Sequence, residues 1–326
     1  MPITLAEAKV GMADHVNQAV IDTFRRSSAL LDNLTFDNAI SPGTGGSTLT
    51  YGYIQLKSPS TAAVRTINDE YTAGEAKREE KTAKAIIMGG SFKIDRVIAE
   101  TSGAVNELVF QAEQKVKATA NFFHNCVING TSAASGTGYV VKTFDGLKKM
   151  LTGTANEFTS TVDISDAAKV DANYNAFLDE IDALVSAIDG TPTALLMNTA
   201  MLTKFRSIAR RSRNYEEATN DLGRKVEKYC GIELWDMGKY YNGTESVDVI
   251  ATDTDGKTDI YAVCLGLDGL HGISPTGNSV IATHMPDLAL PGAVKEGDVE
   301  LVAGIVLKST LKAAVLKGVQ IKGATA

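Results

Sequence analysis

Hydrophobic and polar positions in residues 48–96 follow the two-residue period of extended chain. Residues 48–57 alternate, and seven of the eight residues 75–82 are polar or charged. Residues 85–94 then become more apolar, with an interruption at Gly89–Gly90. The alternation gives the first arm two faces, one with Tyr51, Tyr53 and Gln55 and the other with Gly52, Ile54 and Leu56. These patterns predict two long strands that form a two-stranded projection.

This projection has little apolar core of its own, because the first half of its second arm offers almost nothing to bury. A two-stranded hairpin that stands alone is only marginally stable in water. We therefore expect the projection to pack on another protein surface, and we expect that surface to belong to another copy of the chain.

The clearest helical pattern covers residues 103–128. Its apolar side chains recur at the spacing of one helix face, namely Val105, Leu108, Val109, Ala112, Val116, Ala120, Phe123 and Val127. Asn129–Gly130 is a stop signal. At about 1.5 Å per residue the helix would be ~39 Å long, which predicts a structural beam. Phe122 lies off the apolar face, which suggests a contact outside the domain of the helix.

The second half of the chain mixes helices and strands. Amphipathic periodicity predicts helices over 173–190 and 199–211, with Asn198 as the N-cap of the later one. Residues 143–151 predict one short helical turn. Strand patterns occupy 193–198, 231–237 and 248–267, and one or two more strands fall within 298–322. The order of these elements predicts a mixed α+β fold.

The N-terminal region gives two weaker signals. Thr4 and Glu7 have the spacing of a capping box, which predicts the start of a helical stretch. The glycine-rich residues 41–48 lack the lysine that a phosphate-binding loop requires, so we interpret them as a flexible joint.

Composition limits the classes of function. The 326 residues are 44% hydrophobic and 22% charged, which suits a globular protein with a real core. A net charge of −7 argues against a protein that binds nucleic acid tightly through the phosphates of the nucleic acid. The three cysteines, Cys126, Cys230 and Cys264, are interpreted as reduced thiols. Neither a secretory signal nor a membrane-spanning run is visible, so we expect a protein made and kept in the cytoplasm.

No motif predicts catalysis, a cofactor or a metal site. Residues 252–259 resemble a calcium loop, but alanines stand at both of its terminal ligand positions. Asp255–Gly256 instead favours a hairpin turn between the flanking strand patterns. The four histidines are scattered without metal-ligand spacing.

An arginine cluster in residues 206–214 has three interpretations. It consists of Arg206, Arg210, Arg211 and Arg213. The first interpretation is a set of cations that complement the dipole at a helix C-terminus. The second is a contact with a neighbouring subunit, and the third is a contact with nucleic acid phosphates.

The order of these parts resembles the major capsid proteins of tailed bacteriophages, with the Hong Kong-phage-type capsid fold. Residues 71–100, "YTAGEAKREEKTAKAIIMGGSFKIDRVIAE", are similar to the extended loop of that family where it runs into the long spine helix. Residues 143–151 resemble its turn after the spine helix. Residues 193–210 and 229–238 resemble its apical run of strand, helix and glycine-led strand, and 309–322 resemble its closing strand.

The resemblance implies a division into domains. An N-terminal arm would cover 1–46 and an extended loop 47–92. A peripheral domain with the spine helix would combine 93–168 with 286–326, and an apical α/β domain would cover 169–285.

The resemblance also implies a structural, non-enzymatic subunit of an icosahedral shell around double-stranded phage DNA, without a cofactor. Partners would be other copies in pentamers and hexamers, a separate scaffolding protein, a portal, decoration proteins and weakly bound DNA, but no membrane. The shell would assemble in the host bacterial cytoplasm. Candidate subunit contacts are Arg65, Glu70, Lys77, Arg78, Glu79, Glu80, Lys81, Phe122, Arg210, Arg211 and Arg213.

Three other readings stay open on the sequence. The chain has features of an encapsulin-like compartment shell of similar fold, which would take up cargo and need no scaffold. It also fits a cytoplasmic α/β ligand-binding protein whose projection serves dimerisation. A tail-tube or other virion protein is a further alternative, which the long helix disfavours.

Overall fold

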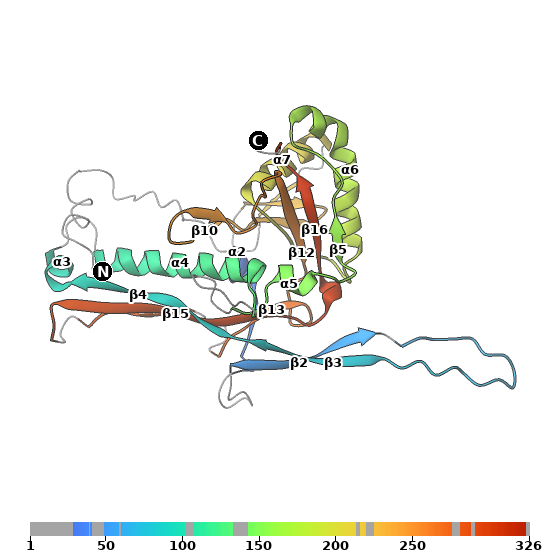
Figure 1. Cartoon of the computed structure of the whole chain (residues 1–326), viewed down its shortest axis with the longest axis horizontal. Coiled ribbons are helices and arrows are strands. Elements are labelled where there is room, and N and C mark those ends of the chain that lie inside the picture. Colours follow the sequence, from blue (N-terminus) through green and yellow to red (C-terminus); the bar gives the residue numbers. More distant parts are fainter. Residues whose placement is uncertain are drawn as a thin grey trace.

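A long helix that lies along two long strands forms the lower layer of the molecule (Figure 1). The computed structural model describes residues 29–38, 40, 49–58, 60–101, 107–132, 143–212, 216–219, 225–275, 281–287 and 291–323. The helix is α4 (Glu107–Asn129), and the strands are β4 (Ile86–Asp95) and β15 (Val294–Leu307). A second unit stands on one end of this layer, and a two-stranded ribbon projects beyond it (Figure 1).

β4 and β15 pair antiparallel along the whole of β4, from Asp95 opposite Val294 to Ile86 opposite Ala303. The strand continues through Gly89–Gly90, where the sequence suggested an interruption. Gly89 has φ +153°, and a Cβ added there would lie 1.9 Å from the carbonyl oxygen of Val299. The glycine therefore lets the two backbones approach closely without breaking the pairing.

β15 is the centre of a five-stranded sheet with the order β1-β13-β15-β14, and β4 also pairs with β15. The other strands are β1 (Phe36–Asp37), β13 (Leu270–Ile273) and β14 (Ile281–His284), and the short helices α2 (Ala29–Asn33) and α3 (Arg96–Thr101) flank the layer. The N-terminal stretch that begins at Thr4 and the joint at 41–48 lie outside the described residues.

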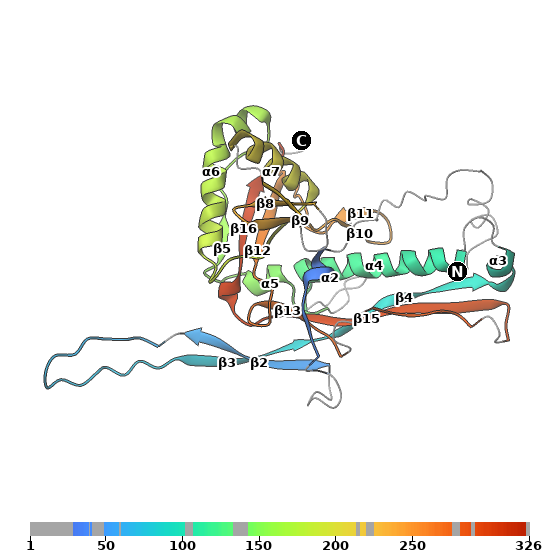
Figure 2. The ribbon, with the colours of Figure 1, turned by 180° about the vertical axis from the view of Figure 1, so that it is seen from behind.

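The upper unit is built on a seven-stranded sheet with the order β5-β16-β12-β6-β9-β8-β7. These strands are β5 (Glu157–Thr159), β6 (Ala194–Met197), β7 (Glu216–Thr219), β8 (Lys225–Tyr229), β9 (Ile232–Asp236), β12 (Lys257–Val263) and β16 (Ala313–Gln320). The helices α6 (Ala167–Ser186) and α7 (Thr199–Ser212) pack on one face of the sheet (Figure 2). The short elements α5 (Leu147–Leu151), β10 (Lys239–Tyr241), β11 (Ser246–Asp248) and η2 (Thr310–Lys312) complete the described chain.

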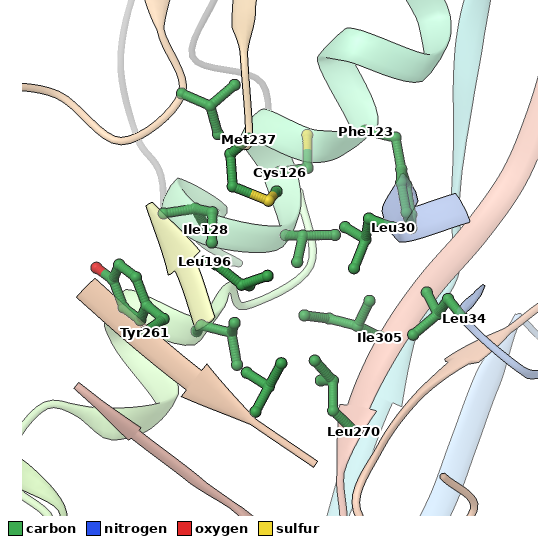
Figure 3. Close-up of a cluster of buried hydrophobic side chains, with 14 of the residues drawn as sticks. Leu30, Leu34, Phe123, Cys126, Ile128, Leu196, Met237, Tyr261, Leu270 and Ile305 are labelled. Carbon is green, nitrogen blue, oxygen red and sulfur yellow. The ribbon is translucent and has the colours of Figure 1, made fainter. Parts of the chain in front are cut away.

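Two buried clusters share this sheet because successive strand residues point to opposite faces. Leu195 and Met197 belong to the cluster under α6 and α7. Leu196 belongs instead to a cluster with Phe123 of α4 and Ile305 of β15, so a single core joins the upper unit to the lower layer (Figure 3). Burial of apolar surface is favourable, at about 25 cal/mol per Å², so this shared core stabilises the contact between the two units.

Most elements confirm the periodicity of the sequence. The long helix, the helices at α6 and α7 and the strand at β6 all form. The side chain of Asn198 caps α7, because its Oδ1 accepts a hydrogen bond from the backbone N–H of Met201 at 2.8 Å. The C-terminal pattern forms two strands, β15 and β16.

The hairpin expected at Asp255–Gly256 is wrong in its pairing. A turn does form, with Gly256 at φ +81° and a hydrogen bond from its N–H to the Asp253 carbonyl at 3.0 Å. However, β11 pairs with β10, while β12 pairs with β16 and β6. Between these two strands, five of the seven side chains of β12 are buried, so burial of its apolar residues determines its pairing.

The domain division stays a prediction, but two of its boundaries cross elements of the structure. The boundary at 92 falls inside β4, which belongs to the sheet of β15. Residues 286–326 divide between the two sheets, because β15 lies under α4 while β16 lies in the upper sheet between β5 and β12. In the described part of the chain, no helix is both long enough and apolar enough to cross a membrane.

Candidate subunit-contact surface

The ribbon that projects from the lower layer consists of β2 (Thr50–Ser58) and β3 (Lys77–Lys84). The strands pair antiparallel from Thr50 opposite Lys84 to Ser58 opposite Lys77. The predicted two-stranded projection is thus present. The last hydrogen bond between its strands, at the end nearest the lower layer, runs from the N–H of Ala85 to the carbonyl of Leu49. The side chains of residues 60–80 are exposed without exception. This stretch makes the ribbon an arm that the rest of the chain does not cover.

The end of the arm, which we call the ribbon tip (residues 60–76), contains an ordered turn. The N–H of Asp69 donates to the Thr66 carbonyl at 3.2 Å, and the Arg65 guanidinium donates to the Asp69 carbonyl at 3.2 Å. Asn68 has φ +73°, a conformation that asparagine tolerates better than most residues. Arg65 also lies over the ring of Tyr71, 5.4 Å from its centroid. The tip is therefore shaped by its own side chains.

The ribbon tip exposes large apolar side chains to solvent. Val64 is 100% exposed, Ile67 is 90% exposed and Tyr71 is 63% exposed. Single exposed apolar residues are common on proteins, but three on one short turn indicate a contact surface. The sequence pattern pointed to the charged residues of this region and gave no signal for these three apolar residues.

The inner part of the ribbon, which we call the ribbon root (residues 50–55 and 81–84), packs against the lower layer. Tyr51, Tyr53 and Ala83 contact a small buried cluster that includes Ile273 and Val306. Gln55 is buried on the same face, whereas Ile54 on the opposite face is 65% exposed. The alternation in the sequence correctly predicted two faces for this strand. However, the face with Tyr51 and Tyr53 packs on the protein, and the face with Ile54 is the one that points into solvent.

Hydrogen bonding and burial fix the two tyrosines of the root. The Tyr51 hydroxyl donates to Asp37 of β1 at 3.2 Å, and the rings of Tyr51 and Tyr53 stack with centroids 6.2 Å apart. Burial raises the pKa of Tyr51, and the carboxylate of Asp37 raises it further. Burial also raises the pKa of Tyr53, with a contribution from Asp145. Both hydroxyls therefore stay protonated at neutral pH.

A cavity of about 770 Å³ lies between the ribbon root and the segment that contains α5. Its wall includes Lys81 and Lys84 of the ribbon, Lys149 of α5 with Asp145 just before this helix, and Leu307 at the end of β15. Lys149 pairs with Asp145 at 2.8 Å. Although burial opposes the shift, hydrogen bonds from Lys149 and Ser132 hold the pKa of Asp145 below its usual range.

The ribbon brings together seven of the predicted contact residues. They are Arg65, Glu70, Lys77, Arg78, Glu79 and Glu80, all exposed, and the half-buried Lys81. Glu80 pairs with Ile54, whose side chain is 65% exposed, so it lies on the outward face of the ribbon. Arg78, two residues earlier on β3, lies on the same face.

The other predicted contact residues lie away from the ribbon. Phe122 is half-buried and packs against the main core, so it serves the interior of its own chain. Arg210 is exposed at the end of α7, and Arg211 pairs with Asp171 of α6 within the chain. Arg206 pairs with Glu227 at 2.8 Å. Arg213 lies outside the described residues.

No group of three or more His, Cys, Asp or Glu side chains in the described ranges is arranged to hold a metal ion. His124 is buried in α4, where burial lowers its pKa to about 4. Burial raises the pKa of the Cys126 thiol to about 12, so this thiol stays protonated at neutral pH. These groups serve packing and do not converge on a common site.

Comparison with known proteins supports one family. Residues 16–231 match the family model of the SU10 major capsid protein. Comparison with curated proteins gives no match.

Solved structures of similar fold cover nearly the whole chain. The SrpI encapsulin complex from Synechococcus elongatus has a TM-score of 0.63 at 13% identity, over 100% of this chain and 99% of the other. The capsid of Myoviridae phage XM1 has a TM-score of 0.57 at 13% identity, over 97% and 99%. Mycobacterium phage Bobi gives a TM-score of 0.54 at 11% identity, over 97% and 98%. At these identities the likeness shows a shared capsid fold.

The family match covers more than half of the chain, and the α+β architecture agrees with that of the phage capsids. The family is that of a structural protein that associates with copies of itself in a virion capsid, and the fold agrees with it. The chain therefore belongs to the SU10 major capsid protein family and is a structural capsid shell protein of the tailed-phage type.

Proposed function

We propose that the chain assembles through pentamers and hexamers into an icosahedral shell that encloses double-stranded DNA, without a catalytic role. In this proposal the ribbon of each subunit lies across a neighbouring subunit. The observation that carries it is the uninterrupted exposure of residues 60–80, which include a tip with three large apolar side chains. A second copy of the chain supplies the surface that the ribbon lacks in the single subunit.

Charge and repetition support the same arrangement. Lys77, Arg78, Glu79 and Glu80 place both signs of charge along one exposed strand. A single exposed ion pair contributes little to stability, but a shell repeats each contact in every subunit. Contacts of this head-to-tail kind close into rings, which suits pentamers and hexamers.

The remaining partners follow from the same proposal. A separate scaffolding protein would guide assembly in the host cytoplasm, and a portal and decoration proteins would join the shell. The net charge of −7 favours weak and non-specific contact with packaged DNA. The arginines at the end of α7 would contact neighbouring subunits rather than DNA.

Negative-stain electron microscopy of the full chain tests the role of the ribbon. We expect shells, sheets or rings from the unaltered chain, and none from a variant that lacks residues 60–76. A finer variant combines Val64→Asp with Ile67→Asp. Because both side chains are fully or almost fully exposed, the double variant should fold normally and still lose assembly.

The matched control is Leu267→Asp, at a side chain that is 51% exposed in the turn before β13 and is not part of the ribbon. It should assemble like the unaltered chain. Normal assembly by the deletion variant would contradict the proposed role of the ribbon. Compact monomers from every variant, including the unaltered chain after addition of its scaffold, would contradict the shell itself.

A further inference from the structure

His271 lies at the contact between the ribbon root and the five-stranded sheet. It belongs to β13, and its side chain is 0% exposed. The Tyr51 ring of β2 meets the imidazole edge to face, with centroids 6.0 Å apart. The neighbouring Ile273 and Val306 contact the same root. The root of the ribbon therefore packs against a buried histidine.

Among the described residues, neither imidazole nitrogen of His271 makes a hydrogen bond of standard geometry, although the backbone of Gly269 lies close enough to act on its pKa. Buried polar groups are almost always paired, because leaving one unpaired costs free energy. A fully buried imidazole without a well-formed hydrogen bond is therefore unusual. This position is thus a weak point in the attachment of the ribbon.

Three titratable or charged groups face His271 from the elements around it. Asp37 comes from β1, Tyr51 from β2, and Lys308 follows the end of β15. Burial lowers the pKa of His271 and the charge of Lys308 lowers it further, whereas the backbone of Gly269 and the charge of Asp37 act in the opposite direction. The imidazolium form is therefore disfavoured while the ribbon root stays in place.

We propose that His271 makes the attachment of the ribbon root to the sheet sensitive to pH, so that protonation of the imidazole releases the root. A charged imidazole at this position needs water or a carboxylate. Asp37 is the nearby carboxylate, but it already accepts the hydrogen bond of Tyr51. Protonation of His271 therefore opposes the same contacts that hold the ribbon.

The direction of the effect follows from proton linkage. In the released state the imidazole regains an ordinary pKa of about 6.5. Because the attached state binds the proton more weakly, lowering the pH through that value favours release. One linked proton changes the equilibrium by up to about tenfold per pH unit, and the effect vanishes above about pH 7.5.

Hydrogen exchange measured by mass spectrometry on the full chain tests the proposal. Protection factors for residues 50–55 and 81–86 are measured at pH 7.5, 6.5 and 5.5, after correction for the intrinsic exchange rate at each pH. Residues of α6 serve as the internal reference. The variants are His271→Gln and, as the matched control, His284→Gln at an exposed histidine of β14.

In the unaltered chain, protection of the ribbon root should fall by up to about tenfold per pH unit, while α6 keeps its protection. His284→Gln should behave in the same way, and His271→Gln should remove the pH dependence. A flat profile in the unaltered chain overturns the proposal, and so does an unchanged slope in His271→Gln. An equal loss in α6 also overturns it, since that result means general acid unfolding.

The profile of the unaltered chain decides the question even where His271→Gln does not fold. The inference concerns the same ribbon as the proposed function, but each proposal can be contradicted without the other. Hydrogen exchange reports on the root within the chain, whether or not shells form, and electron microscopy reports on the contact between chains.

Discussion

The replacement of Asn198 by alanine provides a quantitative test of how the upper unit is held together. Asn198 is 0% exposed, and its side chain joins α7 to the segment between β11 and β12. Its Nδ2 lies 3.0 Å from the Ile250 carbonyl, 3.1 Å from Thr252 Oγ1 and 2.9 Å from Thr258 Oγ1. Its Oδ1 caps α7 through the N–H of Met201.

The magnitude follows from these contacts. An amide nitrogen has two hydrogens, so at most two of its three neighbours are fully bonded at one time. Each buried hydrogen bond contributes about 1 kcal/mol net, and the N-cap contributes about 1 kcal/mol more. We therefore expect Asn198→Ala to lower the free energy of unfolding by about 3 kcal/mol. Asn198→Ser keeps an oxygen for the cap and should lose about 2 kcal/mol.

Urea unfolding of the unassembled chain at pH 7.5, followed by tryptophan fluorescence, measures both losses. Trp235 is 5% exposed beside this site and reports its unfolding. Thr258→Val removes one acceptor and provides a double-variant cycle with Asn198→Ala. A loss below 1 kcal/mol for Asn198→Ala, or equal losses for the alanine and serine variants, would refute this account of the site.

Three further predictions concern the core. Gly89→Ala should prevent the β4–β15 pairing and yield insoluble or unfolded chain in an expression assay, because its Cβ would collide with the Val299 carbonyl and φ is +153°; soluble folded protein would contradict this. His124 has a pKa of about 4 in the folded chain and an ordinary pKa of about 6.5 in the unfolded chain. The free energy of unfolding should therefore be constant above pH 6.5 and fall by about 3 kcal/mol between pH 6.5 and pH 4. Unfolding curves of His124→Gln should lack this pH-dependent loss. Phe205→Ala should cost about 3–5 kcal/mol, because its fully buried ring packs edge to face on two other aromatic rings; a midpoint of unfolding like that of the unaltered chain would contradict it.

Local signals in the sequence predicted local structure well. The cap at Asn198 needs only the residue and the backbone that follows it, and the long helix needs only its own apolar face. The two strands of the ribbon were likewise visible, the first in the alternation of residues 48–57 and the second in the polar run of residues 75–82.

Contacts between residues far apart in the sequence were harder to predict. Alternation gave two faces to β2, but only the position of the sheet decides that Tyr51 points inward and Ile54 outward. Arg211 pairs with Asp171, which lies 40 residues away and gave no signal of its own. The family resemblance supplied the long-range arrangement that the periodicity of a single chain does not contain.

The position of β15 has a consequence for the biosynthesis of the subunit. Asp95 finds its strand partner at Val294, about 200 residues later in translation, and β16 enters the upper sheet later still. Pairings between such distant residues are slow to form, because a long loop must close first. Neither sheet is complete until the ribosome has delivered these last strands. A chain that terminates before Val294 therefore lacks the central strand of the lower sheet, on which the ribbon is mounted, and also the strand that lies between β5 and β12 in the upper sheet.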